Sequence, residues 1–254
     1  MAIAFKGLLH SLPPRKVVKQ KLISALYPPL CLACRDEVED EGFCGSCWAE
    51  TDFIVGNICD ACGAPLFSDD ASSTAYCDTC LASPPDWQRG RAAVLYNGGG
   101  ARVIMALKYA DRWDLAKPLA HFMISAARDI LPADIVAPVP LHWRRLFTRK
   151  YNQAALLSAA VSDKLDTKHI PDLLHRHKHT VVQKDMNRET RLQNQMNAIS
   201  MNPKFKDAVQ NKRILLIDDV MTTGATLSAC ADACKSAGSR DVNVLVFARV
   251  AKPL

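Results

Sequence analysis

Apolar positions between residues 91 and 254 fall into short runs with two different periods. The uninterrupted apolar run at 214–217 predicts a strand that is covered on both faces, and the largely apolar stretches 91–97, 135–139 and 241–248 predict further strands. Between these runs, apolar residues at helical spacing predict helices over 101–109, 115–130, 151–165 and 224–235, with Gly98-Gly99-Gly100 as a turn before the first helix. Alternation of strands and helices predicts an α/β fold, a parallel sheet flanked by helices.

The remaining stretches follow neither pattern. We expect a short amphipathic helix between Val17 and Tyr27, where Pro28-Pro29 would end it. Residues 171–200 are polar and are predicted to be irregular. Their three histidines at alternate positions would face the same way rather than converge on a metal, so we expect them to be solvated or to face phosphate. These histidines are His175, His177 and His179.

These patterns divide the chain into an N-terminal segment (1–30), a cysteine-rich module (31–82) and an α/β domain (91–254), with Ser83-Pro84-Pro85 as a linker. No apolar run approaches the length of a membrane span, and the first apolar stretch is too short for a signal peptide. We therefore expect a cytoplasmic protein.

Eight of the ten cysteines lie in the module, as four CxxC pairs. Each pair can place two thiolates on one tight turn, so two turns complete a tetrahedral site. Cytosolic thiols stay reduced, which favours zinc over disulfides. Pairing the turns in sequence gives a double zinc ribbon with two structural Zn²⁺ sites, and interleaved pairing stays open. The predicted ligands are Cys31, Cys34, Cys44, Cys47, Cys59, Cys62, Cys77 and Cys80.

Charge separates the two halves of the chain. Residues 1–90 hold 7 Lys and Arg against 12 Asp and Glu, whereas residues 91–254 hold 25 against 14. The first part is thus acidic, at −5, and the second is basic, at +11. Zinc modules that grip nucleic acid are normally basic, so this one is expected to brace the fold or to contact a partner.

The clearest chemical motif follows the strand predicted over 214–217. Asp218 and Asp219 are expected to end this strand, and a loop leads from them into the next helix. Amides at a helix N-terminus and hydroxyl groups can hold a phosphate, whereas paired carboxylates suit the hydroxyls of a polyol. A ribose 5-phosphate meets both demands. The predicted loop residues are Val220, Met221, Thr222, Thr223, Gly224, Ala225 and Thr226.

A second candidate region follows the strand predicted over 135–139. Val139, Pro140 and Leu141 form its turn, and a basic cluster comes next. In open α/β sheets, ligands bind at the carboxyl ends of strands, so a functional role is favoured over a solvated charged turn. The cluster comprises Arg144, Arg145, Arg149 and Lys150.

The run Asp-Asp-Val-Met-Thr-Thr-Gly-Ala-Thr is similar to the phosphoribosyl pyrophosphate (PRPP) motif of type I phosphoribosyltransferases. With the four CxxC pairs, Leu107-Lys108-Tyr109, the segment 138–154 and the string from Thr180 to Asn194, the whole chain resembles the ComF family. One departure is Lys150, where that family usually has glycine. The resemblance implies a zinc ribbon joined to a phosphoribosyltransferase-like domain.

The resemblance also implies roles for the candidate residues. Asp218 and Asp219 would hold the ribose hydroxyls, and residues 222–226 the 5-phosphate. The 139–141 turn would cradle the pyrophosphate, whose charge a bridging Mg²⁺ and basic side chains would neutralise. These side chains are Lys108, Arg144, Arg149 and Arg191.

Two function classes stay open. As an enzyme, a phosphoribosyltransferase, the chain would transfer ribose 5-phosphate to an acceptor that the sequence does not identify. As a non-catalytic protein, it would sense PRPP or grip single-stranded DNA with the same pocket and basic edge. The family resemblance implies a role in DNA uptake or nucleotide-related metabolism, with single-stranded DNA or a helicase-type protein as a further partner.

Overall fold

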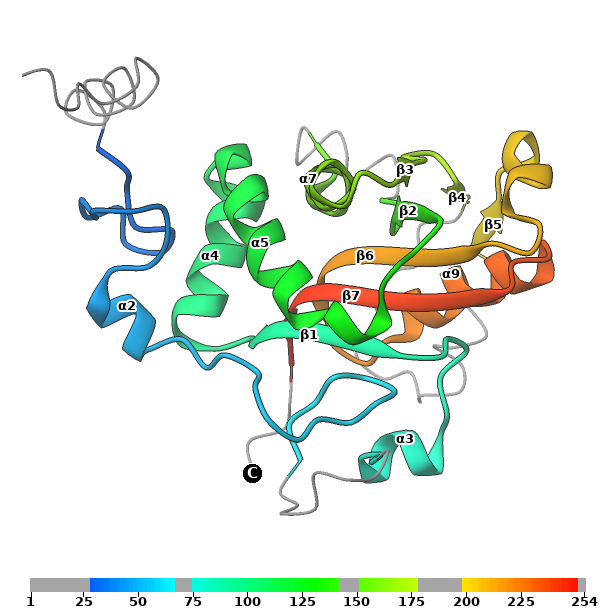
Figure 1. Ribbon diagram of the computed structural model, residues 1–254, viewed down its shortest axis with the longest axis horizontal. Helices are drawn as coiled ribbons and strands as arrows, with labels where there is room; N and C mark the ends of the chain where they lie inside the picture. The colour runs from blue at the N-terminus through cyan, green and yellow to red at the C-terminus, as the bar shows by residue number, and fades with distance from the viewer. Residues whose placement is uncertain (1–27, 67–74, 142–150, 178–197, 251–254) are drawn as a thin grey trace, which may run out of the picture.

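A five-stranded sheet forms the centre of the molecule (Figure 1). The computed structural model describes residues 28–66, 75–141, 151–177 and 198–250. The strand order is β1-β7-β6-β2-β3, and every neighbouring pair is parallel. This confirms the predicted α/β fold. The strands are β1 (Gly90–Leu95), β2 (Ile135–Pro138), β3 (Lys168–His169), β6 (Arg213–Met221) and β7 (Asp241–Arg249).

Both faces of the sheet are covered, as the unbroken apolar run at 214–217 predicted. In β6, Ile214 and Leu216 face one hydrophobic core, whereas Leu215 and Ile217 face the other. Three helices cover the second face, and α9 covers the first together with the short antiparallel pair β4–β5 (Figure 1). The elements are α4 (Gly98–Tyr109), α5 (Ala116–Ala126), α7 (Gln153–Leu165), α9 (Ala225–Ser236), β4 (Leu174–Arg176) and β5 (Ile199–Met201).

Short 3₁₀ turns complete the connections at Trp113–Leu115, Arg128–Ile130, Pro203–Phe205 and Asp207–Val209. The single helix predicted over 115–130 is thus a 3₁₀ turn, α5 and a second 3₁₀ turn. Within the described residues, every helix is too short or too polar to span a bilayer.

The glycines at 98–100 form no separate turn, so that prediction is wrong. All three belong to the first turn of α4. A Cβ atom at Gly98 would lie 2.0 Å from the carbonyl oxygen of Glu50, and one at Gly99 would lie 2.0 Å from Oγ1 of Thr51. Glycine is needed here because the cysteine module approaches the helix backbone so closely.

Two further expectations about elements are wrong. β6 does not end at Asp218 and Asp219 but continues to Met221, because Val220 and Met221 keep pairing with Ala248 and Arg249 of β7. The stretch 171–200 is not wholly irregular, since its two ends pair as β4 and β5. His175 and His177 lie on one of these ends with ring centroids 6.2 Å apart, and His179 lies outside the described residues.

The cysteine module extends the sheet at its edge. Residues 52–54 lie antiparallel to β1: Phe53 bridges Val94, and the amide of Ile54 donates to the carbonyl oxygen of Ala93 at 2.9 Å. The buried Arg91 side chain forms ion pairs with Asp60 of the module (2.6 Å) and with Asp129. The module therefore packs directly on the sheet. Its helices are α2 (Gly45–Ala49) and α3 (Asp78–Ala82).

Candidate functional site

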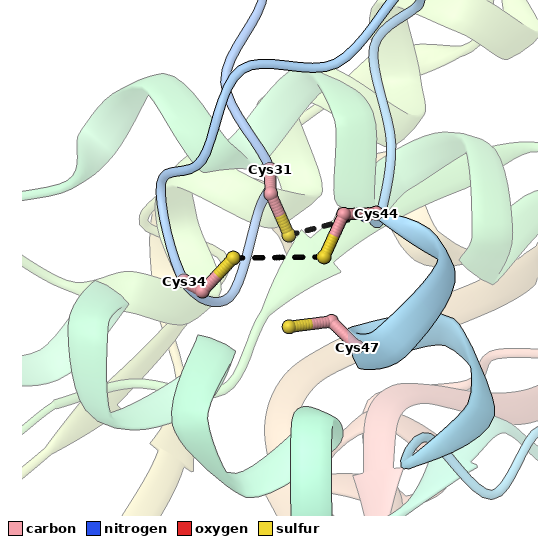
Figure 2. A group of neighbouring side chains, drawn as sticks. All are labelled: Cys31, Cys34, Cys44 and Cys47. Atoms are coloured by element: carbon pink, nitrogen blue, oxygen red, sulfur yellow. Dashed lines mark hydrogen bonds between the residues drawn. The ribbon is translucent and has the colours of Figure 1, made fainter.

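The eight module cysteines form two groups of four thiols. Within each group the sulfur atoms lie within 4.8 Å of one another. The first CxxC pair joins the second and the third joins the fourth, which confirms sequential pairing. Figure 2 shows the four side chains of the first group pointing towards a common centre. The groups are Cys31, Cys34, Cys44 and Cys47, and Cys59, Cys62, Cys77 and Cys80.

The geometry of both groups fits a tetrahedral zinc ion. Zn–S bonds of about 2.3 Å give a tetrahedron edge of about 3.8 Å. The Cys34–Cys44 sulfur distance is 3.6 Å, and the Cys62–Cys77 distance is 3.8 Å. The Cys44 amide also donates to Sγ of Cys31 at 3.3 Å (Figure 2). Four thiolates close the coordination shell, so a bound zinc would be structural.

The two groups share one local design. After the first CxxC turn of each group comes a residue with positive φ, Arg35 (72°) or Gly63 (70°). The second CxxC turn of each group opens a short helix, α2 or α3, with a cysteine as its N-cap. Although burial opposes ionisation, backbone amides of Cys34 and Cys44 lower the pKa of Cys31 to about 6. Such amide contacts favour the thiolate form that binds zinc.

The acidic pair lies near the carboxyl end of β6. Because both residues belong to the strand, their side chains leave it on opposite sides. Burial and the charge of Asp219 raise the pKa of Asp218 to about 7, although the charges of Lys108 and Arg176 act in the opposite direction. Near neutral pH, the Asp218 carboxyl can therefore either accept or donate a proton.

Lys108 lies beside the acidic pair. Its Nζ lies 3.1 Å from Oδ1 of Asp219, and both side chains are largely buried. Lys108 sits in the last turn of α4. The hydroxyl of Tyr151, just before α7, donates to the carbonyl oxygen of Leu107 at 2.7 Å. This contact fixes the helix end that carries the lysine.

The 139–141 turn lies at the same edge of the sheet. Val139 follows β2, and its amide donates to the carbonyl oxygen of Ile217 in β6 at 2.9 Å. Asn152 then caps α7 with its side-chain oxygen and donates from Nδ2 to the carbonyl oxygen of Val139 at 3.1 Å. The other predicted basic residues lie outside the described residues: Arg144, Arg145, Arg149, Lys150 and Arg191.

The loop between β6 and α9 leaves two hydroxyl groups open to solvent. Thr222 and Thr223 are exposed, and Gly224 takes a left-handed conformation with φ 80° directly before α9. Helix N-termini carry amides without intrahelical partners and a partial positive charge. Exposed hydroxyls beside a helix N-terminus are groups that can hold a phosphate.

Sequence reasoning missed two arginines beside this site. Nη1 of Arg249 donates to the carbonyl oxygens of Met221 (3.2 Å) and Thr222 (2.5 Å). Arg176 lies near enough to Asp218 to act on its pKa. The position of Arg249 at the carboxyl end of the last strand was a usable signal, because parallel neighbours bring such ends together. Arg176 carried no comparable signal, since its surroundings were predicted to be irregular.

Comparisons with known proteins agree with both parts of the structure. Residues 22–81 match the family model "Double zinc ribbon domain", and residues 152–253 match "Phosphoribosyl transferase domain". Among solved structures, the allosteric regulatory enzyme of purine biosynthesis is similar over 72% of this chain and 32% of its own, with 19% identity and a TM-score of 0.35.

Two curated relatives cover nearly the full chain. Competence protein F of Haemophilus influenzae is 29% identical over 227 residues, which are 87% of this chain and 90% of that protein. DNA utilization protein YhgH of Escherichia coli is 30% identical over 233 residues, which are 87% of this chain and 97% of that protein. With its double zinc ribbon and its phosphoribosyltransferase domain, the chain belongs to the ComF family.

Proposed function

We propose that the chain binds PRPP with Mg²⁺ at the carboxyl edge of β6 and β2, as a transferase-type domain that serves DNA uptake. The observation that carries this proposal is the meeting of three features at one edge. These are the Asp219–Lys108 ion pair, the Asp218 carboxyl, and a helix N-terminus that follows two exposed threonines. Acids for hydroxyls beside a cradle for phosphate match a phosphorylated ribose.

Different residues would bind different parts of PRPP. Thr222, Thr223 and the α9 amides would hold the 5-phosphate, and the two acids would accept hydrogen bonds from the ribose hydroxyls. Lys108 would neutralise negative charge on the leaving pyrophosphate, which the 139–141 turn would bind. Mg²⁺ is usually bound through one or two carboxylates plus substrate phosphates, and the oxygens at this edge fit that donor set. The ion would neutralise part of the pyrophosphate charge.

Calorimetry with PRPP and Mg²⁺ tests the proposal. The double variant Asp218→Asn with Asp219→Asn keeps the shape of both side chains but removes their charge. Each lost charge-assisted hydrogen bond should weaken PRPP binding by about 1.5 to 3 kcal/mol. Asp207→Asn, at an exposed position away from the edge, is the matched control and should bind as the native protein does. Unchanged affinity in the folded double variant would refute the assignment.

The DNA connection comes from the relatives, whose names tie them to competence and DNA utilization. We extend that role to this chain because the relationship spans nearly its whole length. We also propose a cytoplasmic location, since a reducing compartment keeps the eight ribbon cysteines available as thiolate ligands for zinc.

Single-stranded DNA binding at the same edge is a second candidate function. Tyr109 and Trp113 are each 67% exposed and lie just beyond Lys108, where bases could stack on them. Trp113→Ala should weaken binding of a labelled oligonucleotide by about 1 to 3 kcal/mol, the usual worth of one stacked base. Trp48→Ala, an exposed tryptophan on the acidic module, serves as the control. Equal oligonucleotide binding by both variants would exclude Tyr109 and Trp113 as a surface for stacked bases. The link to DNA would then be a helicase-type protein partner.

A further inference from the structure

The second zinc group lies directly behind the phosphate loop. Cys59 and Cys62 are buried in the same hydrophobic core as Met221 and Leu227, the residues on either side of the loop. The first group lies elsewhere: Cys47 accepts from Arg102 of α4 at 3.5 Å, near the beginning of that helix. From Gly98 to Lys108, α4 rises about 15 Å, so the first group acts on the site only from a distance.

Trp87 connects the second group to the loop. Its Nε1 donates to the carbonyl oxygen of Ala61, between Cys59 and Cys62, at 2.6 Å. Its ring lies against Gly224, where a Cβ atom would come within 2.7 Å of the ring. One side chain, 6% exposed, thus contacts both the metal-binding turn and the motif glycine.

Arg249 holds the same loop from the end of the last strand. Its guanidinium holds the carbonyl oxygens of Met221 and Thr222, and the next amide, of Val250, also donates to Met221 at 2.9 Å. Arg249 therefore fixes the backbone at the start of the loop, while Trp87 contacts Gly224 near its end.

We propose that zinc in the second group positions the phosphate loop, and that Trp87 is the positioning residue that couples this zinc to PRPP binding. This inference rests on the proposed function, because it concerns the same ligand site. Zinc would fix the 59–62 turn, whose Ala61 carbonyl orients the indole ring behind Gly224.

Such coupling must be reciprocal. If zinc in the second group raises PRPP affinity by some factor, PRPP must raise zinc affinity there by the same factor, typically about 5- to 150-fold. The first group instead contacts the beginning of α4. PRPP should therefore protect one zinc ion of the two.

Zinc release to a chromophoric chelator tests this directly in the full chain. Cys34→Ser and Cys77→Ser each remove one site and so assign the two release phases. With PRPP and Mg²⁺ added, we expect release from the second group to slow by about tenfold, within the usual range of coupling, and release from the first to stay the same. Inorganic phosphate alone should give a smaller effect, because it fills only the cradle.

Variants then separate positioning from general stabilisation. Trp87→Ala should abolish the protection, and Trp87→Phe, which keeps a ring behind Gly224 but has no Nε1 donor for the Ala61 carbonyl, should lose most of it. Because Trp87→Phe preserves most of the packing, it serves alone if Trp87→Ala does not fold. Trp48→Ala, in the first ribbon, should behave as the native protein. PRPP that binds by calorimetry yet slows both phases equally, or neither, would overturn this inference alone. Absence of any PRPP binding would overturn the proposed function as well.

Discussion

At the scale of single residues, Asp218 is the group whose protonation matters most. Its pKa of about 7 lies well above the usual value of 3.8, because burial and Asp219 both oppose its charge. In the folded protein it therefore binds a proton over a range in which the unfolded chain has released it. The stability that this proton contributes is fully present below pH 4 and is lost as the pH rises through 7.

Asp218→Asn removes this dependence. Between pH 5 and pH 8 the native protein should lose free energy of unfolding as Asp218 ionises, whereas the variant should not. The difference in free energy of unfolding, variant minus native, should therefore rise from pH 5 to pH 8, on the order of 2 kcal/mol at about 1.4 kcal/mol per pKa unit. Urea unfolding at the two pH values measures the gain, and Asp207→Asn provides an exposed carboxylate for comparison. A gain that is the same at both pH values would mean that Asp218 is already ionised at pH 5.

Residues that belong to a sequence motif were predictable from the sequence. Residues that reach the site only through tertiary packing were not. The cysteine spacing gave both zinc groups, and the strand-to-helix motif gave the acids and the loop. Trp87 lies 137 residues from Gly224 in the chain. Its role depends on how the second ribbon packs behind the sheet, which no local pattern encodes.

At the scale of elements, the β6–α9 loop depends on one glycine. Gly224 has φ 80°, a conformation that costs other residues about 1 to 2 kcal/mol, and its missing side chain leaves room for Trp87. Gly224→Ala should therefore lower the free energy of unfolding by at least that amount and also weaken PRPP binding. Thermal unfolding measures the first effect. Gly42→Ala, where a Cβ atom would meet nothing within 4 Å, should leave stability nearly unchanged.

Element boundaries were the least predictable part of the fold. Acidic residues usually break apolar strands, yet β6 continues through both acids because β7 offers partners as far as Arg249. The glycines at 98–100 suggested a turn, but they allow α4 to begin against Glu50 and Thr51. In both cases a neighbouring segment, distant in sequence, decided the local structure.

At the scale of the whole molecule, the two closed sets of thiols predict the metal content. Elemental analysis of protein purified under reducing conditions should find about two zinc ions per chain, and Cys34→Ser should lower this to about one. Because zinc ligation contributes folding free energy, chelation should also unfold the ribbons. A folded module that contains almost no zinc would contradict the assignment.

The pairing of residues 52–54 with β1 has a consequence for solubility. These residues join the two ribbons and cover the outer side of a strand that is almost entirely apolar. Uncovered strands of this kind recruit other chains edge to edge, and aggregation follows. Loss of zinc would therefore do more than unfold a small module. It would expose the edge of β1, and separate molecules would pair through their β1 strands.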